Sequence, residues 1–195
     1  MALFRLTSAN ESFPRVHGSG LYLRAPTMND YEEWAVLRAE SRAFLEPWEP
    51  LWPADDLTRT AFRRRIRRYI DEIRNDCAYP LLVFASPGDL LVGGLTLGLI
   101  RRGVSQSATV GYWMGERYAG RGLMTEAVKA TSRFAFGELG LRRLEAACLP
   151  TNGPSIRLLE KAGYIREGLA RRYLCIAGEW QDHLLYARLR DDPNA

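Results

Sequence analysis

The stretch GERYAGRGLMTEAVKA, residues 115–130, places two glycines in an arginine-bearing turn and continues directly into a helical pattern. Gly120 and Gly122 would let main-chain N–H groups crowd around an anion, because glycine lacks a Cβ and adopts positive φ freely. A helix that begins at this turn adds the positive end of its dipole. The stretch therefore predicts a phosphate-binding turn at a helix N-terminus.

Three other interpretations of the two glycines have to be weighed on this stretch, and the first of them fails. A P-loop requires a Lys-Ser/Thr pair after its last glycine, and none follows here. A Rossmann turn requires a third small residue, but Thr125 stands at that position. It also requires a parallel βαβ unit, whereas the strand before this turn follows a predicted antiparallel meander. Glu145 lies near the distance expected for a ribose-binding acid, which is weak support. An ordinary strand-to-helix connection needs no ligand. The rest of the chain has to decide.

The pattern along the chain predicts one α+β domain with a mixed, mostly antiparallel central sheet flanked by helices. A length of 195 residues suits a single domain, and 47% apolar with 26% charged residues is an ordinary globular composition. We expect strands at 21–26, 79–86, 90–100, 107–115, 142–149, 167–177 and 180–190, and helices at 27–41, 58–75, 123–136 and 152–164. The prolines of 44–53 exclude regular helix there. We expect residues 1–19 to be an N-terminal extension, 20–190 the domain and 191–195 a C-terminal tail.

Composition limits the other classes of protein. Cys77, Cys148 and Cys175 stand far apart without disulfide or metal spacing, and His17 and His183 are expected to be satisfied or surface imidazoles. No metal site is predicted, and the chain is expected to be reduced and cytoplasmic. No stretch is apolar and long enough to span a membrane, and the N-terminus has no secretory pattern. The net charge of +4, carried almost entirely by arginine, mildly favours anionic partners.

Two motifs resemble those of the GCN5-related N-acetyltransferase (GNAT) family. Arg117, Gly120 and Gly122 match the family's diphosphate-binding turn, and LPTNGPSIRLLEKAGYIREG (149–168) is similar to its later motif N-x-x-S-x-x-L-x-E-K-x-G-[FY]. The order of elements over residues 20–190 also fits. The resemblance implies the GNAT fold and acetyl-CoA as the cofactor. By the same resemblance the cofactor-binding residues are Tyr112, Trp113, Met114, Arg117, Tyr118, Gly120, Arg121, Gly122, Leu123, Met124, Asn152, Ser155 and Lys161.

Two further segments resemble the ribosomal-protein-alanine N-acetyltransferase branch of that family, which acetylates protein α-amines. They are RAFLEPWEP (42–50) and ARRYLCIAGEWQDHLLYA (170–187). The resemblance implies that they flank the mouth where the acceptor amine enters. The residues that it places at the substrate are Trp48, Glu49, Trp52, Glu179 and Trp180. Core packing of the three tryptophans is the alternative.

Direct acyl transfer needs a donor for the oxyanion and a proton for the departing thiolate. The family supplies the oxyanion donor from the main chain of the central strand, here around Trp113 or Met114. Many relatives carry a tyrosine in the cofactor helix, where this chain has Leu159. Ser155 is then the candidate that hydrogen-bonds the leaving sulfur. Helix capping is the alternative role for Ser155 and for Asn152.

The group that removes the amine proton is not evident from the sequence. Relatives often carry glutamate on the central strand where this chain has Thr109. The carboxylates expected near the mouth are Glu46, Glu49, Glu179 and Asp182, of which Glu46 and Asp182 are the predicted catalytic ones, directly or through water. An α-amine, with a pKa near 8, is about a tenth neutral at pH 7, far more than a lysine amine. The missing strong base therefore favours an α-amine acceptor.

The predicted function is acetyl transfer from acetyl-CoA to the N-terminal α-amine of a protein, such as a ribosomal protein beginning with Ala or Ser. One alternative keeps the cofactor and acetylates a small amine, an aminoglycoside or a polyamine, for which a deep acidic pocket would be expected. Another is a non-catalytic assembly factor that binds acetyl-CoA or RNA. The run RRRIRR (63–68) is expected to be a solvated helix face, so nucleic acid is expected only through a ribosomal client. Both a monomer and a homodimer fit.

Overall fold

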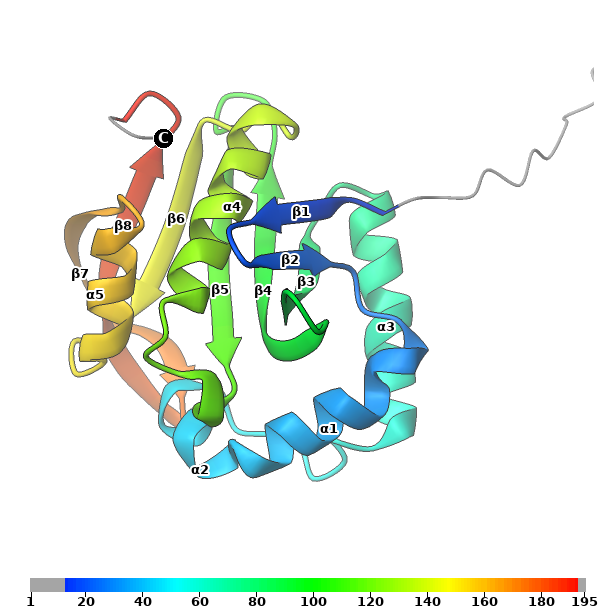
Figure 1. The fold of residues 1–195 in the computed structure, drawn as a ribbon. Helices are drawn as coiled ribbons and strands as arrows, with labels where there is room; N and C mark the ends of the chain where they lie inside the picture. The colour runs from blue at the N-terminus through cyan, green and yellow to red at the C-terminus, as the bar shows by residue number, and fades with distance from the viewer. Residues whose placement is uncertain (1–12, 193–195) are drawn as a thin grey trace, which may run out of the picture.

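An eight-stranded mixed sheet forms the centre of the molecule in the computed structural model, which describes residues 13–192 (Figure 1). The strand order across the sheet is β1-β2-β3-β4-β5-β6-β8-β7. The strands are β1 (Arg15–Gly18), β2 (Leu21–Arg24), β3 (Tyr79–Ala85), β4 (Leu90–Arg101), β5 (Ser107–Met114), β6 (Arg143–Cys148), β7 (Ile165–Ile176) and β8 (Glu179–Leu189). All neighbours pair antiparallel except β5 and β6, so the predicted mixed, mostly antiparallel sheet is confirmed.

Helices cover both faces of this sheet. They are α1 (Tyr31–Glu40), α2 (Arg42–Leu45), α3 (Arg59–Arg74), α4 (Leu123–Gly137) and α5 (Gly153–Lys161), with short 3-10 turns η1 (Met28–Asp30), η2 (Glu46–Trp48) and η3 (Glu116–Tyr118). α4 and α5 pack on one face, and α1 and α3 pack on the other. In Figure 1, α4 lies across the middle strands and forms the crossover that joins parallel β5 and β6.

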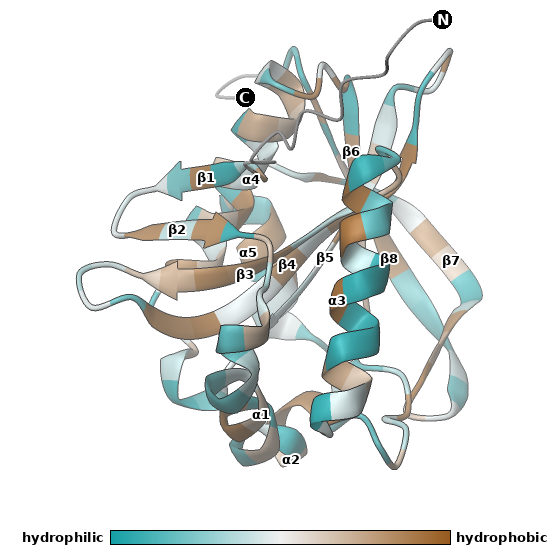
Figure 2. Cartoon of the chain, turned by 90° about the vertical axis from the view of Figure 1, so that its right-hand side faces the viewer, coloured by the Kyte–Doolittle hydropathy of each residue, from teal (hydrophilic) through white to brown (hydrophobic). Residues whose placement is uncertain are grey.

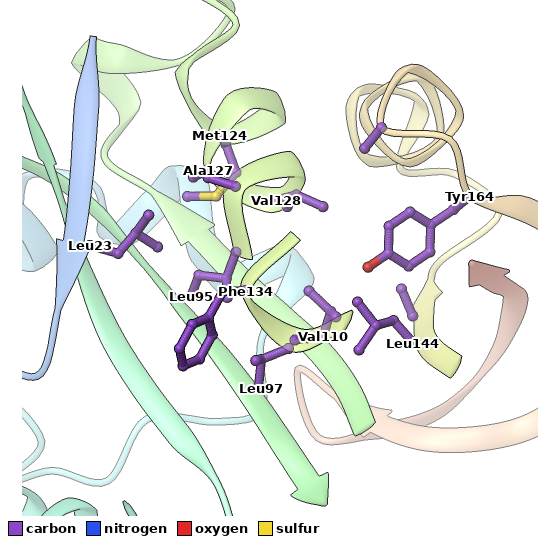
Figure 3. Packing of buried hydrophobic residues seen from close by; sticks show 14 of the residues in the cluster. Leu23, Leu95, Leu97, Val110, Met124, Ala127, Val128, Phe134, Leu144 and Tyr164 are labelled. Carbon is purple, nitrogen blue, oxygen red and sulfur yellow. The ribbon is translucent and has the colours of Figure 1, made fainter. Parts of the chain in front are cut away.

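Strand alternation explains why the sheet has two buried faces. On β2, Leu23 points toward α4, whereas its neighbour Tyr22 packs with the α1 and α3 layer. On β3, Val83 and Phe84 divide between the same two layers. Figure 3 shows the α4 side, where Met124, Ala127 and Val128 of the helix meet leucines of β2 and β4 and Val110 of β5. The continuous apolar runs of the middle strands follow from burial on both faces.

Two segments differ from what the sequence predicted. Residues 42–48 contain a single α-helical turn, Arg42–Leu45, and a 3-10 turn with Pro47 in its first positions, which proline permits because no N–H bond is required there. The sheet begins at Arg15, inside the segment 1–19 that was predicted as an extension. β1 has only four residues, too few to show an alternating pattern, and its pairing with β2 defines it.

The arginine run of α3 lies on the solvent side of the molecule. Arg63, Arg64, Arg67 and Arg68 are exposed, whereas Phe62 and Ile66 are buried against the sheet. In Figure 2 the helix carries mainly hydrophilic residues along its visible face. Between residues 13 and 192 no helix combines the length and apolar composition needed to cross a membrane.

Candidate acyl-transfer site

The sheet opens between β5 and β6, which run parallel. β5 and β6 pair over just three positions, Ser107–Thr109 with Arg143–Glu145. Beyond Thr109 the two strands diverge toward the end that carries the glycine turn (Figure 1). From Val110 to Met114, β5 is therefore bonded to β4 alone, and its other edge presents unpaired main-chain groups to the opening. An extended chain with amide groups could bond to such an edge.

A cavity of about 810 Å³ occupies this opening. Its walls come from β5, the glycine turn, the end of β6, the first turns of α5, the α2–η2 segment and the β7–β8 hairpin. Among the residues predicted to bind cofactor, those that line it are Tyr112, Trp113, Met114, Tyr118, Gly120, Arg121, Gly122, Leu123, Met124, Asn152, Ser155 and Lys161. One opening in the sheet thus gathers residues from both halves of the chain.

The glycine turn has the conformation that the sequence suggested. Gly120 and Gly122 have φ of 75° and 78°, in the left-handed region that favours glycine. Gly122 is the N-cap of α4 and provides no side-chain cap, so the first N–H groups of the helix stay available beside the cavity. Arg121 also lines it. An anion such as a diphosphate fits this helix N-terminus.

Arg117, the first residue of the motif, does not line the cavity. Its guanidinium Nη1 lies 3.2 Å from Glu40 Oε2, and its cation stacks over the Tyr118 ring at 5.1 Å. Both charged side chains of this pair are about half exposed. The predicted contact of Arg117 with cofactor stays a prediction.

Two hydroxyl groups meet at the cavity, on the face of the sheet that α4 and α5 cover; Ser155 comes from α5 and Tyr112 from β5. The Asn152 Oδ1 accepts the Ser155 N–H at 3.1 Å and caps the helix, as its sequence position indicated. Ser155 Oγ lies 2.7 Å from Tyr112 Oη, which comes from the open part of β5. Burial raises the pKa of Tyr112 although the Ser155 hydrogen bond acts against it, so the phenol keeps its proton.

Two residues near the Tyr112–Ser155 pair differ in their position relative to the cavity. Leu159, which stands where many relatives have a tyrosine, is fully buried and is not among the lining residues. Cys148 does line the cavity; burial raises the pKa of its thiol, and a hydrogen bond from Ser155 offsets part of that rise. Tyr112 is the phenol that sequence reasoning assigned only to cofactor contact. Its pairing with Ser155 depends on the strand register and left no local signal.

The opposite side of the cavity is organised by an ion pair. Arg38 Nη1 and Nη2 donate to both oxygens of Glu49 at 2.7 and 2.8 Å, and Trp52 Nε1 donates to Glu49 Oε2 at 2.7 Å. The Arg38 guanidinium also lies 4.0 Å from the Trp52 ring and 4.9 Å from the Trp113 ring. Glu49 and Trp48 line the cavity, whereas Trp52 does not line it and contacts Glu49 and Arg38. Arg38 was not singled out from the sequence, since nothing local marks its partner.

Besides Arg117 and Trp52, four more predicted residues lie outside the lining. Glu46 pairs with Arg42 within one turn, with Oε1 2.6 Å from Nε, and both side chains are exposed. Asp182 Oδ1 accepts the main-chain N–H of Arg172 at 2.8 Å, where β7 bulges and Arg172 takes a φ of 46°. Glu179 and Trp180 are exposed on the hairpin. The catalytic roles of Glu46 and Asp182 stay predictions, with a structural partner now visible for each.

His183, predicted to be a satisfied or surface imidazole, is one of the cavity's lining residues. Its side chain is 2% exposed, and its Nδ1 lies 2.9 Å from the carbonyl oxygen of Gln181. Its ring contacts Tyr173 of β7 edge to face at 5.9 Å. The sequence signal for this position is its place on β8, one residue after Asp182, but no spacing rule connects it to the glycine turn. Among the described residues, no group of His, Cys, Asp and Glu is arranged to hold a metal ion.

The fold and the opening in the sheet define the class of protein, an acyl-CoA-dependent N-acetyltransferase, and comparison with known proteins gives the same result. The acetyltransferase (GNAT) domain family matches residues 20–165. The chain is 38% identical over 175 residues to a probable N-acetyltransferase, YjcK, of Bacillus subtilis, covering 90% of this chain and 97% of that one. It is 30% identical over 167 residues to the ribosomal protein uS5-alanine N-acetyltransferase of Escherichia coli, covering 85% and 86%.

A solved structure agrees at the level of the whole fold. RimJ of Mycobacterium smegmatis, in complex with a CoA disulfide, superposes with a TM-score of 0.84 at 31% identity and covers 91% of this chain and 86% of that one. The chain belongs to the GNAT family of N-acetyltransferases, in the RimJ-like branch. Its cofactor is acetyl-CoA, and it is an acyltransferase.

The residues of this chain fit that cofactor. The N–H groups at the start of α4 suit a diphosphate, and the free edge of β5 suits a chain of amides. Acetyl-CoA supplies the activated acyl group, and the protein provides donors and proton positions around it. Tyr112 and Ser155 place two hydroxyl groups on the α5 side of the opening, and the predicted hydrogen bond of Ser155 to the leaving sulfur stays a prediction.

Proposed function

We propose that this enzyme acetylates the N-terminal α-amine of a protein, and that its client is a ribosomal protein. The observation that carries the proposal is the way the two branch-specific segments meet. The main-chain N–H of Ala177, in the β7–β8 turn, donates to the carbonyl oxygen of Glu49 at 2.9 Å. Segments more than 100 residues apart in the chain therefore form one rim at the mouth of the cavity.

The rim is suited to a peptide more than to a polycationic small molecule. Among the described residues, Glu49 is the only acidic one that lines the cavity, and Arg38 already occupies both of its oxygens. A polyamine or aminoglycoside would need several free carboxylates, whereas the end of a polypeptide brings one amine and otherwise needs surface to lie on. The rim supplies that surface through Phe44 and Trp48 on one side and Leu174 on the other.

Apolar side chains continue outward from the rim. Leu51 is 71% exposed and Trp180 is 65% exposed, and Leu51 packs against the hairpin turn at Gly178. Exposed apolar side chains on segments that form a mouth are typical of a surface that binds a partner chain. The similarity to the uS5-alanine acetyltransferase of E. coli gives independent support for a ribosomal client.

Thiol release from acetyl-CoA tests the proposal. The acceptor is a short basic peptide beginning with alanine, and its control is the same peptide with a blocked α-amine and free lysines. We expect release only with the free N-terminus. Equal release with both peptides would move the acceptor to lysine. Release with spermidine and silence with both peptides would instead favour the small-amine alternative.

A matched pair of variants tests the rim. Trp180→Ala should raise KM for the peptide several-fold and leave the Kd of CoA unchanged, because Trp180 lies outside the cofactor cavity. Val104→Ala removes another exposed apolar side chain, from the β4–β5 loop, and should change neither constant. Unchanged peptide KM in Trp180→Ala would remove the outer surface from the proposal.

A further inference from the structure

The cavity passes through the sheet, and its two ends carry different chemistry. Along β5, Tyr112 packs toward the α4 and α5 layer, whereas Trp113 packs toward the α1 and α3 layer. The Tyr112–Ser155 hydroxyl pair therefore lies on one face of the opening, and Trp113, with the Arg38–Glu49 pair beside it, lies on the other. The rim proposed for the acceptor lies on the Trp113 side, so an amine would reach a carbonyl in the opening from that side, while the hydroxyl pair lies on the other.

His183 lies on the Trp113 side of this opening. On β8 its neighbour Leu184 packs into the α4 and α5 core, as does Tyr186, so alternation directs His183 to the opposite face. It lines the same cavity as Leu174 and Ile176 of β7, the strand that forms the rim for the acceptor together with β8. The buried imidazole is thus on the side from which an amine would attack.

The hydrogen bond of His183 determines which ring nitrogen can take a proton. A carbonyl oxygen only accepts, so Nδ1, 2.9 Å from the Gln181 carbonyl, must carry the hydrogen. In the neutral imidazole Nε2 then has the free lone pair, and it makes no hydrogen bond to any described residue. This arrangement of one fixed and one free nitrogen is what a general base requires.

The carboxylates near the mouth are less suited to this step. Glu46 and Asp182 lie outside the cavity lining and hold Arg42 and the Arg172 main chain. Glu49 lines the cavity, but protonating it would sacrifice charge-assisted hydrogen bonds from Arg38 and Trp52.

We infer that His183 is the catalytic base of this enzyme and that its Nε2 accepts the proton of the attacking amine, directly or through one water. The amine nitrogen forms the new bond to the carbonyl carbon while the carbon–sulfur bond breaks, and the sulfur leaves with the electron pair. The proton lost by nitrogen goes to Nε2 and then to solvent, and the thiolate, hydrogen-bonded by the Tyr112–Ser155 pair, takes its proton from water. The inference rests on the proposed function only in requiring that the acceptor is an amine.

Three variants test this role in the thiol-release assay. His183→Asn places an amide near the position of Nδ1, so it can keep the donor to the Gln181 carbonyl while removing the base. We expect kcat/KM to fall about 100-fold or more, since general bases contribute about 10²–10⁴, with the Kd of CoA within about twofold of wild type. His183→Ala should recover activity when imidazole is added. His17→Gln, which changes an exposed histidine on β1, should behave as wild type.

The outcomes separate this inference from the identity of the acceptor. His183→Asn with activity within about threefold of wild type would overturn it, as would loss of activity together with CoA binding and without rescue by imidazole. If the wild-type enzyme acetylates spermidine but neither peptide, the peptide proposal fails, and the variants are then compared with spermidine as the acceptor. If wild type transfers to no amine, the proposed function and this inference fail together.

Discussion

Replacing Gly122 by alanine tests the cofactor site through the backbone alone. Gly122 has a φ of 78°, and a Cβ added there would meet no heavy atom within 4 Å. The cost therefore comes from the left-handed conformation, about 1–2 kcal/mol for a residue with a Cβ. In a chain of this size that corresponds to a fall in Tm of roughly 2–8 °C. Relaxing the strain would also turn the first N–H groups of α4 away from the cavity.

Gly140 provides the matched control. Its φ is 65°, and a Cβ there also meets nothing within 4 Å, but it lies after α4 and away from the cavity lining. Gly140→Ala should lose as much thermal stability as Gly122→Ala and bind CoA as wild type does. Gly122→Ala should in addition bind CoA at least about tenfold more weakly, because losing one hydrogen bond to a charged group costs about 1.5–3 kcal/mol.

The assays are thermal unfolding without ligand and calorimetric titration with CoA. Equal CoA affinity in the two alanine variants, at equal loss of Tm, would refute the placement of the diphosphate on this turn. A destabilisation confined to Gly122→Ala would refute the strain argument, since both glycines have left-handed φ and open space around them.

Two further predictions concern the two sides of the cavity. Tyr112→Phe removes the hydroxyl 2.7 Å from Ser155 and should lower kcat more than it raises the KM of acetyl-CoA; equal changes in both would contradict the role of the pair. Burial raises the pKa of Tyr112 in the folded state. The stabilisation that the protonated phenol provides is therefore complete below about pH 10 and is lost as the pH rises further. Urea unfolding of Tyr112→Phe should accordingly be less sensitive to alkali than that of wild type. Arg38→Met breaks the bidentate pair with Glu49 and should destabilise the fold by about 3–5 kcal/mol, whereas Arg42→Met, at an exposed pair, should cost under about 0.5 kcal/mol in the same urea titration. Similar effects of the two methionines would show that the Arg38 pair does not organise the rim.

Several features of this protein could be predicted because their signals are local. The positive φ of Gly120 and Gly122, the Asn152 cap and the C-terminal stop of α5 at Gly163 each depend on a few neighbouring residues. Helix α3 follows from its spacing of apolar residues together with the Thr58 cap, whose hydroxyl accepts the Ala61 N–H.

Other features gave no usable signal. Tyr112 and Ser155 are 43 positions apart and meet only because β5, β6 and α5 assume one register. Asp182 was a plausible base from its place in the hairpin, but at a bulge in β7 its carboxylate accepts a hydrogen bond from the main-chain N–H of Arg172. Bulges depend on strand pairing, so a single strand's sequence does not reveal them.

By itself, the sequence determined the conformation at the glycine turn, the order and type of most elements, and the family to which the chain belongs. The tertiary structure decided where the sheet opens and which side chains face each side of that opening. The physical reason is range: caps, turns and periodicity act over a few residues, whereas the pairing of β5 with β6 for only three positions reflects packing of the whole sheet. That opening places a hydroxyl pair on one face and His183 on the other.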